Sequence, residues 1–277
     1  MINDKDGEVR GQCALCRRYE VLQDSHLLPK ALYRFVRAKD GSPIVINWHT
    51  AWTTDKQVSK HLLCFACELR FHQNGEDWTL QQIYRGEKRF RLLDALNRCT
   101  PVATKPEFSV YALSDVPEVR VHSLSYFAVS IFWRSAATNW RIGDHSLPRS
   151  TFGPKYMAAF SDYLLEKAGF PSNVALHVEV CDDPGVAAKT LMFPAGSKHV
   201  GYHRYEFIVP GMAFHLFVGQ KIPGSIRSCC IMTGERPALF RRNYEQLIYS
   251  KFALFIKTAR ISAALKDEIG ELGLSDR

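Results

Sequence analysis

The sequence lacks any long apolar run. Within its 277 residues, no uninterrupted apolar stretch approaches the roughly 20 residues that a membrane-spanning helix needs. The first residues, 1–6, are polar and do not contain the apolar core of a secretory signal peptide. We therefore expect a cytoplasmic protein without a membrane partner.

Internal repeats and low-complexity segments are also missing, which argues against solenoid architectures. The net charge of +8 does not gather in one block of the chain. A spread of positive charge favours a polyanionic partner, although an ordinary basic surface would have the same composition. Hydrophobic residues make up 46% and aromatic residues 12% of the chain, which is typical of a well-packed globular protein. Its length allows two modest domains or one large domain.

Four of the eight cysteines occur in two Cys-x-x-Cys pairs, Cys13/Cys16 and Cys64/Cys67. In a reducing compartment, this spacing is more typical of metal binding than of disulfide bonding. Four thiolates from two tight turns can form a closed tetrahedral zinc site, whereas coincidental buried cysteines or a redox pair are the alternatives. The other four share no ligand spacing and are expected to be small buried residues: Cys99, Cys181, Cys229 and Cys230.

Potential catalytic side chains lie close to these pairs. His26 belongs to the segment Ser25-His26-Leu27-Leu28-Pro29, and Glu68 and His72 follow the second pair at a spacing of four residues. On a helix, that spacing directs Glu68 and His72 the same way. Histidine, with an unperturbed pKa near ~6.5, can act as a general base on water, and oxygen and imidazole donors can hold a divalent ion. The simpler alternative is a surface histidine and a solvated helix face.

Together these motifs resemble the HNH endonuclease family, also called ββα-metal nucleases, in its branch with a four-cysteine zinc site. The resemblance covers about residues 10–80. It implies a general-base role for His26 and catalytic-ion ligand roles for Glu68 and His72, with Asp24 as a further candidate. The implied cofactors are structural Zn²⁺ and a catalytic Mg²⁺ or another divalent ion.

The sequence departs from the family pattern at three points. Ser25 occupies a position where the family commonly has a metal ligand, and Glu68 replaces an expected histidine. The asparagine that orients the base has no clear counterpart, and His61 and Ser59 are the nearest candidates. These departures leave the zinc-stapled fold as the expectation and make activity the open question.

The expected fold class is α+β. An N-terminal zinc-stapled ββα-metal (treble-clef-like) module with a basic helix is predicted over residues 1–99, followed by a linker over 100–106. A mixed α+β domain for recognition or regulation is predicted over residues 107–277. Helices are predicted after Pro29, within 64–72, and over 79–98, 124–140, 154–168 and 243–268. Strands are predicted over 175–180, 205–209, 213–218 and 226–232.

Basic residues near the motifs could contact phosphates, although they could equally be the solvated face of ordinary helices. The candidates are Lys30, Arg85, Lys88, Arg89 and Arg91. Trp133 and Trp140 are seven residues apart, and we expect core packing rather than base stacking for both.

The preferred hypothesis is a metal-dependent HNH-like endonuclease acting on DNA. The resemblance also implies a setting in bacterial restriction or anti-phage defence. A zinc-stapled nucleic-acid-binding protein without hydrolysis is the main alternative, and a protein–protein adaptor is the third. The sequence leaves open DNA versus RNA, and a homo-oligomer or a defence-system partner protein.

Overall fold

The computed structural model describes residues 2–3, 8–36, 44–46, 51–53, 57–85, 90–142, 145–147, 150–182 and 190–243. Lys88, Arg89 and nearly all of the helix predicted over 243–268 lie outside these residues. Within them, no helix is long and apolar enough to cross a membrane.

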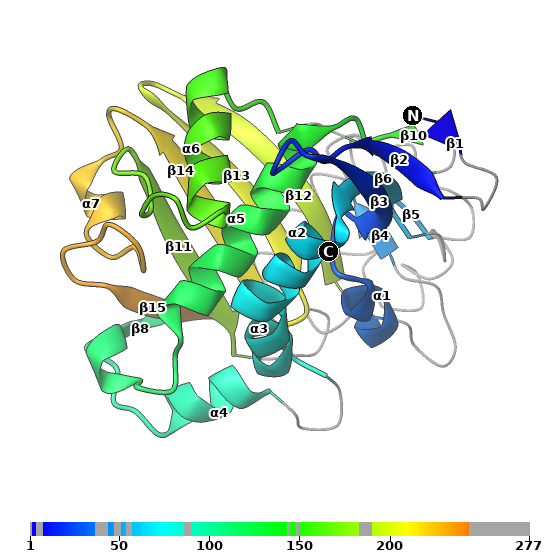
Figure 1. The fold of residues 1–277 in the computed structure, drawn as a ribbon. Helices are drawn as coiled ribbons and strands as arrows, with labels where there is room; N and C mark the ends of the chain where they lie inside the picture. Colours follow the sequence, from blue (N-terminus) through cyan, green and yellow to red (C-terminus); the bar gives the residue numbers. More distant parts are fainter. Residues whose placement is uncertain are drawn as a thin grey trace.

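A nine-stranded sheet forms the largest element of the fold (Figure 1). Its strands pair antiparallel except where β4 meets β12 and where β15 meets β11. In spatial order they are β5 (Ala51–Thr53), β4 (Ile44–Ile46), β12 (Thr190–His199), β13 (Tyr202–Val209), β14 (Met212–Gly219), β11 (Val174–Cys181), β15 (Ala238–Arg242), β8 (Phe108–Ala112) and β7 (Ala103–Lys105).

Helices α5 (Val121–Ala137) and α6 (Pro154–Leu164) lie across one face of this sheet (Figure 1). The α5 sequence is apolar around most of its circumference, which is typical of a helix buried on several sides. Phe132 packs edge-on against Phe207 of β13 with ring centroids 4.9 Å apart, and Phe207 stacks on Phe214 of β14 at 4.7 Å. These aromatic contacts hold α5 to the centre of the sheet.

The N-terminal part forms a smaller sheet in the order β1 (Ile2–Asn3), β2 (Val9–Gln12), β3 (Tyr19–His26), β6 (Ser59–Cys64). Helix α1 (Lys30–Val36) follows β3, and α2 (Phe65–Phe71) begins directly after β6. The antiparallel pair β3–β6 and the following α2 therefore run in ββα order. The predicted α+β class is confirmed, and so are helices at the two predicted N-terminal positions.

The remaining elements are short. They are η1 (a π-helix, His72–Glu76), α3 (Asp77–Gln82), α4 (Arg91–Asn97), η2 (a 3₁₀ helix, Leu113–Asp115), β9 (Arg141–Ile142), β10 (His145–Ser146) and α7 (Gly224–Arg227). The single helix predicted over 79–98 is thus wrong, because α3 ends at Gln82 and the backbone of Ile83 is extended.

The four strand predictions for the second half of the chain are confirmed in part. Three of the four predicted strands are confirmed as β11, β13 and β14, but the strand over 226–232 is wrong. That apolar stretch follows α7 as turns, and Cys230 packs with Ala175 and Phe217. Its hydrophobicity reflects burial of a connection rather than strand pairing.

The predicted helix over 124–140 is confirmed as α5, which ends at Ala137. Trp140 therefore lies beyond the helix, where its indole N–H donates to the carbonyl of Arg134 at 2.8 Å. Trp133 and Trp140 are both buried, as expected for core residues.

The large sheet draws strands from both sides of the predicted domain boundary. Strands β4 and β5 come from within residues 1–99, and β7 lies inside the predicted linker. One hydrophobic cluster also runs from Cys13 to Leu239. The two-domain division stays a prediction. Both strand pairing in the large sheet and packing in the hydrophobic cluster cross the predicted boundary.

Candidate metal centre and catalytic site

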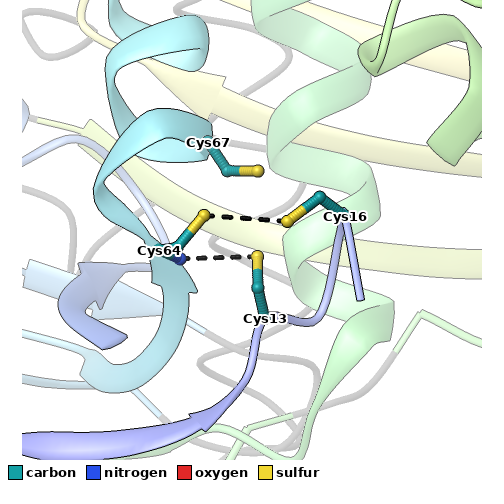
Figure 2. Close-up of side chains that lie close together, drawn as sticks. All are labelled: Cys13, Cys16, Cys64 and Cys67. Atoms are coloured by element: carbon teal, nitrogen blue, oxygen red, sulfur yellow. Dashed lines mark hydrogen bonds between the residues drawn. The ribbon is translucent and has the colours of Figure 1, made fainter. Parts of the chain in front are cut away.

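The four cysteines of the two Cys-x-x-Cys pairs converge. Cys13 and Cys16 lie on the turn between β2 and β3, Cys64 ends β6, and Cys67 lies in the first turn of α2 (Figure 2). All four sulfurs lie within 4.8 Å of one another. The Sγ atoms of Cys16 and Cys64 are 3.7 Å apart, and zinc bound to sulfur at ~2.3 Å in a tetrahedron spaces its ligands at about 3.8 Å. The cluster can therefore bind a metal ion and is consistent with structural zinc.

The backbone shapes this cluster from both sides. The amide of Cys64 donates to the Cys13 sulfur at 3.4 Å, which joins the two pairs before any ion is considered. Arg17 adopts a left-handed conformation (φ 66°) and closes the first turn through its N–H to the Cys13 carbonyl. This tight turn brings Cys13 and Cys16 to the same side.

The thiols of the cluster share protons unequally. Hydrogen bonding from the Cys67 thiol lowers the pKa of Cys13 to about 4. The same contact raises the pKa of Cys67, and burial raises that of Cys64. A cation at the centre would stabilise thiolates on all of them, because metal binding requires the deprotonated form.

His26 lies at the C-terminal end of β3. Its ring Nε2 is 2.8 Å from the amide oxygen Oε1 of Gln57. An amide oxygen can only accept, so Nε2 carries the proton of the neutral ring and Nδ1 keeps its lone pair. Gln57 is two residues before Ser59, one of the two candidates that the sequence offered for the base-orienting position. The family pattern has an asparagine there, so the sequence did not indicate this glutamine.

Two further polar residues share the face of the β3–β6 pair with His26. Asp24 is two residues before it on the same strand, and His61 is directly opposite Asp24 in the ladder. Asp24 is exposed, and His61 is held by a contact of 3.1 Å between its Nδ1 and the Leu22 carbonyl. The structure thus places two imidazoles and a carboxylate on one face of this strand pair.

Ser25 has a structural role at this point. Its hydroxyl is buried and accepts the Leu63 N–H at 3.1 Å, next to the register shift between Gln23 and Asp24. The hydroxyl therefore satisfies a backbone donor at the irregularity of the β3–β6 ladder.

Glu68 faces Arg134, a residue of α5, rather than open solvent. The Glu68 carboxylate is 3.5 Å and the Glu76 carboxylate 2.8 Å from Nη2 of Arg134, whose side chain is 2% exposed. Phe71 packs under the guanidinium, 4.7 Å from ring centroid to Cζ. Burial alone would lower the pKa of Arg134, but the two carboxylates outweigh it and keep the pKa raised. We call Arg134, Glu68 and Glu76 the arginine triad.

The π-helical turn explains how both carboxylates reach one arginine. An α-helix turns by about 100° per residue, which would leave Glu76 about 80° away from Glu68 around the axis. Residues His72–Glu76 are π-helical, turning by roughly 80° per residue, and this brings the two carboxylates to nearly the same side. Gly75 then rests on α5, where a Cβ atom would be 2.7 Å from the backbone nitrogen of Phe127.

The other predicted site residues are more dispersed. His72 is exposed at the start of η1, and Lys30 is exposed at the start of α1. Arg85 donates from Nε and Nη2 to the Leu80 carbonyl, at the end of α3. Arg91 is exposed, and its Nη1 donates to Gln81.

The roles predicted for Glu68 and His72 as ligands of one catalytic ion stay predictions. Within the described residues, the four cysteines are the one group of three or more potential ligands gathered within 4.8 Å. Comparison with family models, with curated proteins and with solved structures gives no match for this chain.

Proposed function

We propose that this protein is a metal-dependent endonuclease with HNH-like chemistry, and that zinc fills its four-cysteine cluster. The observation that carries the proposal is the setting of His26. It ends the first strand of a ββα unit stapled by four cysteines, and Gln57 holds its Nε2 at 2.8 Å. This arrangement supports a base with a free Nδ1.

In the proposed reaction, His26 takes a proton from water through Nδ1, and the resulting hydroxide attacks a DNA phosphodiester. Gln57 acts as a positioning residue, because it fixes the tautomer and the ring plane. A divalent ion such as Mg²⁺ would supply stabilisation of the charge on the phosphorane and on the leaving oxygen.

Asp24 and His61 are the better-placed donors for that ion, because they share the ladder face of His26. Glu68 already faces Arg134. A ligand role for Glu68 would require its carboxylate to leave a buried arginine. We infer that Glu68 instead anchors α2 to α5.

A role in bacterial restriction or anti-phage defence is the setting that the resemblance implies. Lys30, Arg85 and Arg91 are the predicted phosphate contacts that the structure describes, and all three are exposed. Each phosphate that they neutralise would steepen the dependence of binding on salt.

A non-catalytic, zinc-stapled nucleic-acid-binding protein is the second candidate. The engagement of Glu68 by Arg134 favours it, since it removes one predicted ligand from the catalytic ion. Under this alternative, His26→Ala leaves both the affinity for DNA and its salt dependence unchanged, and no variant cleaves.

Cleavage of supercoiled plasmid with Mg²⁺, Mn²⁺ or Ni²⁺ tests the proposal. Wild type should nick or linearise the plasmid, and His26→Ala should lower the rate by about 10²- to 10⁴-fold, the usual contribution of a general base. His199→Ala, at an exposed histidine of the large sheet, is the matched control and should retain full activity.

Zinc content and circular dichroism would show that the variants fold. Cleavage that survives His26→Ala would place the activity elsewhere. The non-catalytic alternative would be favoured if wild type binds DNA but does not cleave it with any of the three metals.

A further inference from the structure

A second cluster of titratable side chains lies on the face of the large sheet opposite α5. Across the strands, His177 of β11 is directly opposite His215 of β14, and His215 is directly opposite Glu206 of β13. Glu179 is two residues after His177 and therefore shares its face. We call these four residues the histidine–glutamate cluster. Three of them are buried: Glu179, Glu206 and His215.

Both ring nitrogens of His215 face carboxylates. Its Nδ1 is 3.2 Å from Oε2 of Glu206, and its Nε2 is 3.6 Å from Oε2 of Glu179. A neutral imidazole has only one N–H, so one of its two nitrogens would then direct a lone pair at a carboxylate. That arrangement requires a positive charge, either a proton on the ring or a metal ion beside Nε2.

The distances are compatible with an ion at this position as well as with a proton. A hydrogen bond between charged partners closes to about 2.7–2.9 Å. Nε2 of His215 is instead buried without a hydrogen-bond partner, whereas Nε2 of His177 is hydrogen-bonded to Oε1 of Glu179 at 3.2 Å. Nitrogen and oxygen ligands at about 2.1 Å from one ion are spaced at about 3.0–3.4 Å. The 3.2 Å separation between His177 and Glu179 lies in this range, and the 3.6 Å separation between His215 and Glu179 is slightly longer.

We propose that His177, Glu179 and His215 form a second metal site that takes a first-row divalent transition ion, with Glu206 as the positioning residue of His215. Two imidazoles and one carboxylate suit ions such as Zn²⁺, Fe²⁺ or Mn²⁺. Glu206 plays the part that carboxylates play beside metal-bound histidines, because it accepts Nδ1–H and leaves Nε2 to bind.

The site closes around its ion rather than standing fully preformed. Its three donors are less tightly gathered than the cysteine sulfurs, so the ion draws the two imidazoles inward. Arginines border the cluster on both sides: Arg204 is 2.7 Å from Glu206, and Arg242 is 3.5 Å from Glu179. These two arginines balance the negative charge of the two carboxylates. A proton on Nε2 of His215 would therefore compete with the ion for this position.

Metal stoichiometry of the full chain tests the proposal. The protein is stripped of metal under reducing conditions, titrated with Co²⁺ or Zn²⁺, and followed by calorimetry and by the Co²⁺ absorption spectrum. Thiolate ligands give intense charge-transfer bands, whereas nitrogen and oxygen ligands give only weak ligand-field bands, so the two sites are read separately.

Wild type should bind the cysteine-site equivalent and, in addition to any ion held beside Asp24 and His61, a further equivalent without thiolate bands. His215→Gln should lose the further equivalent and keep the charge-transfer bands, and the matched control His199→Gln should keep both. Should His215→Gln fail to fold, Glu206→Gln decides the matter through an affinity for the further equivalent lowered by roughly 10- to 100-fold.

Three results would overturn the proposal. Wild type could bind only at its cysteines, which would make the cluster a protonated ion network. The number of equivalents without thiolate bands could be the same in His215→Gln as in wild type, which would place each of these ions elsewhere, for example beside Asp24 and His61. Finally, Glu206→Gln could bind both equivalents with unchanged affinity.

Discussion

The N-terminal module, which carries the four-cysteine cluster, and the nine-stranded sheet are stabilised by different means. The small sheet β1-β2-β3-β6 is held at its end by four cysteines within 4.8 Å of one another. The large sheet instead buries stacked aromatic rings against α5, such as Phe207 and Phe214 at 4.7 Å. A small module that cannot bury enough apolar surface commonly depends on a metal, whereas a large sheet with a helix layer does not.

The two regions meet along α5. Phe71 of α2 packs edge-on against Tyr126 and Trp133, each with ring centroids 6.0 Å apart, and the arginine triad lies beside it. The N-terminal module is therefore held in the fold by two features: its four-cysteine cluster and the contact of α2 and η1 with α5.

Loss of the metal should have the largest effect. Cys64→Ser should unfold the N-terminal module, because structural zinc supplies about 10–16 kcal/mol of apparent folding free energy in small zinc domains. Hydrogen exchange should show lost protection over 8–36 and 57–71 and retained protection over β11–β14. Cys229→Ser, outside the cluster, is the control. Equal loss of protection in both regions would contradict the view that only the N-terminal module depends on the cysteine cluster.

Removal of the central charge of the arginine triad should have the second-largest effect on stability. Arg134→Ala leaves two carboxylates without their buried partner, and we expect the free energy of unfolding to fall by about 3–5 kcal/mol. Urea denaturation measures this change. A triple variant, Arg134→Met with Glu68→Gln and Glu76→Gln, should recover much of the loss. No recovery would mean that packing on Phe71, rather than charge, accounts for the effect.

Gly75→Ala should have a smaller effect at the same contact. The added Cβ would be 2.7 Å from the backbone nitrogen of Phe127, and a helix backbone has little room to yield, so we expect a cost of about 1–3 kcal/mol. Thermal unfolding would report it. Gly169→Ala, where a Cβ meets nothing within 4 Å, should be nearly neutral. Equal effects of both variants would contradict close packing at η1.

Acidification should give the most graded effect. The raised pKa values of Cys64 and Cys67 mean that these thiols hold protons in the metal-free cluster at neutral pH. Metal binding must displace those protons, so affinity should rise with pH, and metal-linked stability should be lost as pH falls. Calorimetry in buffers of different ionisation enthalpy would measure two or more released protons. The unfolding of the large sheet should respond less steeply, and an equal response would weaken the comparison.

Local patterns predicted much of the N-terminal module. The Cys-x-x-Cys spacing indicated the cluster, and Pro29 and the second cysteine pair indicated the starts of α1 and α2. Apolar runs also located α5 and three strands of the large sheet. They misjudged 226–232, because burial of a connection produces the same hydrophobicity as a strand.

Contacts between distant residues decided the rest. The sequence alone determined which side chains could bind a metal or act as a base, since that depends on residue type and short spacing. Only the tertiary structure decided which of them meet: Glu68 faces Arg134, 66 positions away, and His26 faces Gln57, 31 positions away. Such pairings arise from strand register and helix packing, and these depend on the summed burial of the whole chain rather than on any local pattern.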